Sequence, residues 1–552
     1  MSVGALMLTS CNKKMQPFAA DYFTVNPNPL ETSGDLVPAT VSANIPAKFF
    51  KKNAEVTVTP YLVYGDKETP ATPLTLQGEK VRGNHAVISY NNGGNATLPV
   101  AYKYTPEMLT SDLVLAFDVQ QGKKTYSLPR VKVATGVVAT STLADAATVE
   151  PAVGHDKFQR IIKEKVSADI KFLINQTNIR KSELKSDELT ALHQTLKEAQ
   201  GNDKLEVEEL NISSYASPEG GVKLNTRIAE GREKNTQAYL NKELKKNKIE
   251  DFGSLTADFT AQDWEGFQQL VSESNIQDKE LILSVLSMYK DPEQREREIR
   301  NLSSVFDQLA KDVLPHLRRS RLTASVNFIG LSDTEIEEAY KNNAKSLTVD
   351  EMLYAATLTD DVNKQAGIYK TCTEVYPEDY RGWNNLGLCQ YKLGDYTAAA
   401  SNFDKAARIN PSSKEVLMNQ GLCALLNDNY AEAKDKLGAA AGAEGLGDAL
   451  GTYYIKTGDY NAATGAFGNS VSNNAALAKI LTKDYSGAKQ TLAAVAKPNA
   501  TTYYLMAVLG ARTNNEQMVT SNLRQAVKLD PSLANRAKND LEFAKVNLSN
   551  AL

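Results

Sequence analysis

The feature that most constrains the fold of this chain is a residue pattern that recurs after 34 positions in its C-terminal part. Glycine and alanine at fixed offsets permit two helices to approach closely, aromatic side chains fill the space between them, and a proline ends the second helix. Such a unit buries its apolar face only against its neighbours, so the pattern predicts an all-α solenoid with a concave groove over residues 346–547. Its clearest positions are Trp383, Leu386, Gly387, Gly394, Tyr396, Ala399, Phe403, Ala406 and Pro411, followed by Leu417, Gly421, Tyr430, Ala433, Leu437 and Ala440.

This spacing of Trp383, Gly387 and Tyr396 resembles the tetratricopeptide repeat. A degenerate unit precedes the clear pair, and three less regular units follow it. The resemblance implies that the groove takes a peptide or helix of a partner protein. The alternative is that the array packs only on the protein's own domains.

Residues 156–330 show both the alternation typical of strands and the spacing typical of helices. Ala168, Ile170 and Phe172 alternate as in a strand, and Ser186 is a plausible cap for a following helix. A strand, a loop and a helix come next, then a helix-rich stretch at about 251–321, and then a closing strand. We therefore predict an α+β domain with a helical insertion.

The strand–loop–helix at residues 211–240 suggests a small binding site. The loop 213–221 lies at the start of a predicted helix, where free N–H groups and the helix dipole favour an anion. Asn225 and Arg232 are seven positions apart, so they share a helix face. An amide and a guanidinium on one face predict recognition of a carboxylate.

The same stretch resembles the OmpA-like, peptidoglycan-associated domain of the Bacteroidetes type. The residues that carry the resemblance are Ser214, Tyr215, Gly220, Asn225, Ile228, Arg232, Tyr239 and Leu240. It implies binding of the diaminopimelate stem peptide of peptidoglycan, with Arg232 on the carboxylate and Asn225 in support. Ser217 stands where the family has an aspartate for the ligand's ammonium, and Glu219 can substitute from another angle. The alternative is that Arg232 and Asn225 form a surface pair on a domain kept as a scaffold.

The N-terminus carries a short apolar run followed by Leu8-Thr9-Ser10-Cys11. This sequence resembles a bacterial lipobox, although no Lys or Arg precedes the apolar run. The resemblance implies lipidation of Cys11 after a truncated signal and anchoring to a membrane. Residues 12–36 are predicted to form a tether. The signal, the lipobox and this tether together make up the first predicted segment, residues 1–36. The residues just after Cys11 are Asn12, Lys13 and Lys14, and they lack the acidic signal typical of surface-exported lipoproteins of Bacteroidetes-like bacteria. This resemblance favours the periplasmic face of the outer membrane.

Residues 37–140 alternate apolar and polar side chains in several short runs, for example at Val56, Val58 and Leu62. Strands at this spacing predict an all-β sandwich, for which a spacer or protein contact is the default role. Residues 141–155 are small and polar, and they read as a linker.

Composition excludes several function classes. The net charge of −4 argues against a nucleic-acid partner, and no His/Cys cluster has the spacing of a metal site. No catalytic residues, metal or cofactor are predicted. Cys372, Cys389 and Cys423 are expected to be free thiols packed as small apolar groups.

Two functions follow. The first is a non-catalytic outer-membrane lipoprotein that binds or faces peptidoglycan and recruits protein partners through its repeats. The second is a scaffold or assembly subunit of an outer-membrane secretion, insertion or fimbrial complex that does not bind peptidoglycan.

Overall fold

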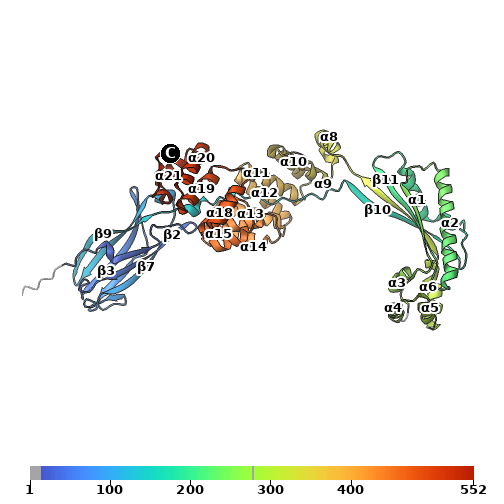
Figure 1. Ribbon diagram of the computed structural model, residues 1–552, viewed down its shortest axis with the longest axis horizontal. Helices are drawn as coiled ribbons and strands as arrows, with labels where there is room; N and C mark the ends of the chain where they lie inside the picture. The colour runs from blue at the N-terminus through green and yellow to red at the C-terminus, as the bar shows by residue number, and fades with distance from the viewer. Residues whose placement is uncertain (1–13, 277–278, 302) are drawn as a thin grey trace, which may run out of the picture. The chain divides into compact units, whose positions relative to one another are not determined.

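The computed structural model describes residues 14–276, 279–301 and 303–552. The chain forms two compact units, of which the first is discontinuous: Met1–His155 with Ala356–Leu552, and Asp156–Ala355. Figure 1 shows the blue N-terminal strands, the green and yellow α+β unit and the orange and red helical array. The predicted lipidation site, Cys11, lies outside the described residues.

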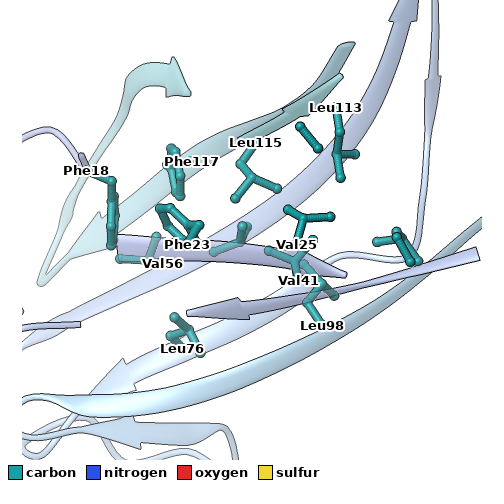
Figure 2. Close-up of a cluster of buried hydrophobic side chains, with 14 of the residues drawn as sticks. Phe18, Phe23, Val25, Val41, Val56, Leu76, Leu98, Leu113, Leu115 and Phe117 are labelled. Atoms are coloured by element: carbon teal, nitrogen blue, oxygen red, sulfur yellow. The ribbon is translucent and has the colours of Figure 1, made fainter. Parts of the chain in front are cut away.

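The N-terminal region is β-rich with several sheets, as predicted. One sheet has the order β1-β2-β7, and a second has the order β6-β5-β3-β8-β9, with β4 paired to β3. Buried side chains from both sheets form one hydrophobic cluster, in which Phe18, Phe23 and Phe117 lie together (Figure 2). The strands are β1 (Phe23–Asn26), β2 (Leu36–Ile45), β3 (Ala54–Tyr64), β4 (Lys67–Pro70), β5 (Leu74–Gly78), β6 (Ala86–Ile88), β7 (Gly94–Lys103), β8 (Ser111–Gln121) and β9 (Lys124–Gly136).

The tether predicted for residues 12–36 is wrong for its described part. Met15 and Phe18 are buried, the Phe18 ring stacks on Phe117 with centroids 4.4 Å apart, and strand β1 pairs with β2. Prolines and asparagines in this stretch oppose long regular elements, but they do not prevent apolar side chains from packing into a sheet core.

The second unit is built on a sheet of order β10-β13-β11-β12. Strand β13 is antiparallel to both neighbours, whereas β11 and β12 are parallel. Helices α1 and α2 lie against one face of this sheet (Figure 1). The strands are β10 (Ile161–Lys171), β11 (Leu205–Tyr215), β12 (Ser254–Thr260) and β13 (Arg319–Ile329), and the two helices are α1 (Asp187–Glu198) and α2 (Val222–Lys246).

The helical insertion between β12 and β13 has its own small apolar core around Phe267, Val271 and Leu317. It begins at Trp264, later than the predicted start near residue 251, because residues 254–260 form strand β12. Its helices are α3 (Trp264–Glu273), α4 (Lys279–Met288), α5 (Pro292–Asn301), α6 (Ser303–Asp312) and α7 (Leu314–Leu317), and the unit ends with α8 (Asp333–Asn343) and α9 (Val349–Ala355).

The C-terminal array is all-α, as predicted, and begins in the first unit with α10 (Val362–Val375). Asp395 and Asn429 cap the second helices of two successive pairs by accepting a backbone N–H, which explains why each helix starts there. The successive pairs are α11 (Tyr380–Lys392) with α12 (Tyr396–Ile409), α13 (Lys414–Leu426) with α14 (Tyr430–Ala439), α15 (Leu446–Thr457) with α16 (Tyr460–Phe467), α17 (Asn473–Leu481) with α18 (Tyr485–Ala494), and α19 (Ala500–Arg512) with α20 (Glu516–Leu529), and α21 (Leu533–Asn539) follows.

The predicted linker at residues 141–155 is wrong. Ala146, Val149 and Ala152 are 1%, 5% and 3% exposed, and they belong to the hydrophobic cluster of the array. In the sequence, a run of small side chains suggests a flexible linker. In the structure, the same small side chains permit the backbone of this segment to approach the helices closely. In the described part of the chain, no helix is both long and apolar enough to cross a membrane.

Candidate functional site

The predicted loop and helix at residues 211–240 form a closed corner of the second unit. Asn225, in the first turns of α2, is 4% exposed, and its Nδ2 donates to the carbonyl oxygens of Ser217 at 2.9 Å and Gly220 at 2.8 Å. The amide therefore fixes the loop between β11 and α2. Its Nδ2 donates only to the protein's own backbone.

Arg232 lies two turns further along α2 and is 1% exposed. Nε donates to the carbonyl oxygen of Gln176 at 3.0 Å, Nη1 to that of Tyr215 at 2.6 Å, and Nη2 to that of Leu173 at 3.2 Å. The guanidinium carbon also lies 5.0 Å from the centre of the Phe172 ring. Each nitrogen of the guanidinium thus has a partner on the protein itself.

The charge on Arg232 is held in an unfavourable environment. Burial, reinforced by the nearby charge of Arg318 and opposed by Glu219, lowers the pKa of Arg232 to about 10. The residue nevertheless stays protonated at neutral pH. Backbone carbonyls stabilise this charge where the resemblance places a ligand's carboxylate.

Glu219 has a cationic partner that the sequence prediction did not assign to the site. Its Oε1 lies 2.8 Å from Nη2 and 3.0 Å from Nε of Arg318, and both side chains are largely buried. Arg300, on the insertion helix α5, donates to the backbone oxygen of Glu219 at 2.5 Å. Ser217 is 5% exposed, and its hydroxyl lies 3.4 Å from Arg318 Nε.

The structure therefore brings Ser217, Glu219, Asn225 and Arg232 to one loop–helix corner and adds Arg318 to them. Within the described residues, Glu219 Oε2 is a buried acceptor without a hydrogen-bond partner. Among the described residues, no group of three or more His, Cys, Asp or Glu side chains has the arrangement of a metal site.

A second candidate site is the groove of the helical array, where three asparagines hold a segment of irregular backbone that contains one short 3-10 helix, η4 (Ala146–Thr148). Asn419 Oδ1 accepts from the N–H of Ala152 at 2.7 Å, and its Nδ2 donates to the oxygen of the same residue at 2.8 Å. Asn385 makes the same pair of bonds with Gly154, at 2.7 and 2.9 Å. Both asparagines are almost fully buried.

The same arrangement recurs further along the groove. Asn474 accepts from the N–H of Asp145 at 3.1 Å and donates to its oxygen at 2.9 Å. The Tyr391 hydroxyl donates to the oxygen of Ala146 at 2.7 Å, and burial raises the pKa of this phenol far above its usual range. The groove predicted for a partner's peptide thus contains a segment of the same chain.

Comparison with known proteins identifies the repeats that form this groove. Residues 380–413 match the family described as tetratricopeptide repeat. The C-terminal array is built of tetratricopeptide repeats. This family match covers one repeat unit, so it does not extend to the rest of the chain.

Similar proteins match over short stretches. Cell division cycle protein 27 homolog of Caenorhabditis elegans is 36% identical over 58 residues, 10% of this chain and 7% of that protein. BBSome complex member BBS4 of Xenopus tropicalis is 38% identical over 72 residues, 13% of this chain and 14% of that protein. The chain thus spans a small part of these relatives. A tetratricopeptide repeat protein from Parabacteroides merdae, of known structure, is 13% identical with a TM-score of 0.30, over 39% of this chain and 91% of that one.

The tetratricopeptide repeats also contact the loop that precedes β2. The Tyr460 hydroxyl donates to the oxygen of Thr32 at 3.1 Å and accepts from the N–H of Gly34 at 3.3 Å. Tyr430, which occupies the equivalent place one helix pair earlier, is hydrogen-bonded to Asp35. The β-rich region is therefore held on the array by specific polar contacts.

The three cysteines in the repeats, Cys372, Cys389 and Cys423, are free and buried, as predicted. Burial raises their thiol pKa values to about 12, 11 and 12. They are small core groups and not reactive thiolates.

Sequence reasoning missed the asparagines that line the groove, although part of the signal was present. Asn385 and Asn419 are separated by the same 34 positions that separate Gly387 from Gly421. A polar residue recurring at one repeat position beside a buried glycine indicates a shared role on the inner face. Asn474 falls in a less regular repeat, where this offset is lost.

Proposed function

We propose that this protein is a non-catalytic scaffold of the cell envelope that joins protein partners through its tetratricopeptide repeats. The observation that carries the proposal is the stack of helix pairs from α11 to α20, which includes the family match at residues 380–413. Stacked repeats present long continuous surfaces, and such surfaces suit protein binding better than catalysis.

The proposal includes a location. Lipid on Cys11 would hold the chain at the outer membrane on its periplasmic face, as the lipobox-like Leu8–Cys11 sequence implies. In cells, Cys11→Ser should move the protein from the membrane fraction to the soluble fraction and abolish incorporation of a labelled fatty acid. A variant that remains membrane-bound and labelled would contradict this part.

Site-specific photo-crosslinking of the full chain in cells tests the scaffold itself. A photoreactive residue at Leu393 or Leu529, which are 48% and 55% exposed on the array, should capture the same protein partners in independent experiments. Val87, 55% exposed in the β-rich region, is the matched control position. Equal capture at Val87, or no protein captured at either array position, would contradict partner binding by the repeats.

Peptidoglycan binding is the second candidate, and one observation favours it. The Arg318–Glu219 pair offers a guanidinium and an unpartnered carboxylate oxygen side by side, which are the groups that a zwitterionic stem peptide would need. The strand–helix order of residues 156–330 also supports the resemblance to OmpA-like domains. In this proposal Arg232 supports the loop, and Arg318 replaces it as the carboxylate ligand.

Co-sedimentation with purified sacculi separates the two candidates. Wild type should sediment with sacculi, and Arg318→Gln and Glu219→Gln should each reduce the bound fraction if the corner holds a stem peptide. Arg321→Gln is the control, because the guanidinium of Arg321, on β13, pairs with Asp169 on the neighbouring strand β10. Failure of wild type to sediment would leave the scaffold proposal intact and reject peptidoglycan binding.

A further inference from the structure

The groove of the repeats recognises the main chain of its occupant. Asn385, Asn419 and Asn474 each bond to both the N–H and the C=O of one residue. Asn384 adds a further donor to the oxygen of Ala152 at 3.0 Å. These bonds form whatever side chain the occupant carries, so the site binds a peptide through its main chain.

The way the segment's side chains pack limits the size of the residues that the groove can accept. Ala146, Val149 and Ala152 point into the cluster formed by the array, and they are spaced three residues apart. Gly154 adjoins the side chain of Arg381, against which a Cβ at this position would be crowded. The site therefore fits a peptide with small apolar residues at every third position, the first two of which are one 3-10 turn apart.

We propose that residues 144–155 are the resident peptide ligand of this groove and that they close it to other peptides. Partners of the repeats then bind the other faces of the array unless the segment is displaced. This inference goes beyond the scaffold function and does not depend on who the partners are.

The attachment of the segment supports the proposal. Just before it, the Ser141 hydroxyl lies 2.7 Å from that of Thr32, and both side chains are buried in the first unit. Just after it, Arg381 Nη1 donates to the oxygen of His155 at 3.2 Å. A ligand fixed near both ends has an effective concentration of roughly millimolar or more, which a free peptide must overcome.

A labelled synthetic peptide of residues 143–155 tests the inference on the full chain by fluorescence anisotropy. The double variant Ala152→Pro, Gly154→Pro removes the two N–H groups that donate hydrogen bonds to Asn419 and Asn385, and it leaves the sequence of the array unchanged. This variant should bind the peptide roughly tenfold or more tightly than wild type. Adding Asn419→Ala to it should remove that binding.

Glu150→Pro is the matched control, because its exposed side chain lies in the same segment and its N–H makes none of the asparagine bonds. It should bind the peptide as weakly as wild type. Wild type binding as tightly as the double variant would show an open groove and overturn the proposal. A double variant that stays folded and binds no peptide would show that the groove does not recognise this sequence.

Hydrogen exchange on the wild-type protein keeps the proposal testable if the double variant fails to fold. The amides of Asp145, Ala152 and Gly154 should exchange as slowly as those of the array helices, although these three N–H groups donate to asparagine side chains and not to a helix or strand ladder. Exchange at the rate of an exposed loop would overturn the proposal.

Discussion

Arg232 Nη1 lies 2.6 Å from the carbonyl oxygen of Tyr215, and the same guanidinium reaches the loop that follows strand β10. One side chain thus ties the end of β11 to a neighbouring loop of the second unit. Because the side chain is 1% exposed, its charge is compensated by these bonds in place of water.

Arg232→Ala should therefore destabilise the second unit by about 2–4 kcal/mol, since the large buried side chain leaves a cavity and three backbone oxygens lose their donor. Urea unfolding followed by circular dichroism measures the change. Arg227→Ala, an exposed position on the same helix, should change the stability little. An Arg232→Ala protein as stable as wild type that loses sacculus binding would instead identify Arg232 as a ligand residue.

Asn474→Ala should destabilise the first unit by about 1–3 kcal/mol, because the N–H of Asp145 loses its acceptor and the oxygen of Asp145 keeps only its bonds from Thr148. Thermal unfolding measures this loss. Asn461→Ala, on the exposed surface of α16, is the control and should be nearly neutral. Equal effects of the two substitutions would mean that the groove asparagine contributes nothing beyond an exposed one.

Gly34→Ala should loosen the β-rich region from the array. Gly34 has a φ of 59°, and a Cβ there would collide with the carbonyl oxygen of Lys456. Gly65 has a φ of 53° and open space around it, so Gly65→Ala reports the backbone cost alone, about 1 kcal/mol.

The difference between the two glycine variants isolates the contact with the array. Calorimetry should show Gly34→Ala less stable than Gly65→Ala by about 2 kcal/mol or more, with broader unfolding. If the two variants melt alike, the contact through Gly34 does not couple the β-rich region to the repeats.

The three buried thiols should resist alkylation in the native protein. In a Cys11→Ser background at pH 8, iodoacetamide should leave Cys372, Cys389 and Cys423 unmodified until denaturant is added. Peptide mass spectrometry reads out each site. Rapid native labelling of any of them would contradict the raised pKa values.

The same thiols predict a pH dependence of stability. Their pKa values rise from 9.0 in the unfolded chain to about 11–12 in the folded protein, so folding favours the protonated form. This contribution is complete below pH 9.0 and is lost as the pH rises through the folded values. Substitution of all three by alanine should flatten that alkaline decline in the unfolding midpoint.

Much of the fold follows from periodicity in the sequence. The spacing of Trp383, Gly387 and Phe403 is enough for the helical repeats, because helix pairs of this kind have one way to stack. The alternation at Val56, Val58 and Leu62 is enough for a strand, and all three are buried in β3. Local patterns predict local elements well.

The occupied groove was not predictable in the same way. Asn419 and Ala152 are 267 positions apart, and a stretch of small residues has no periodicity that reveals its partner. The corner around Arg232 shows a related difficulty. A sequence indicates which charge is present, but it does not tell whether a ligand or the backbone neutralises it.

The position of residues 144–155 in the chain also fixes the order in which the first unit is completed during synthesis. The segment leaves the ribosome before the second unit and before any of the repeats that hold it, and Asn474 follows its partner Asp145 by 329 positions. The last of these partners to emerge is therefore Asn474 on α17, and until then part of the segment is without its groove contacts. The partners follow one another in the opposite direction to the segment, since Gly154 pairs with Asn385, Ala152 with Asn419 and Asp145 with Asn474. Each successive helix pair thus supplies the contact for the next part of a segment that has already been synthesised.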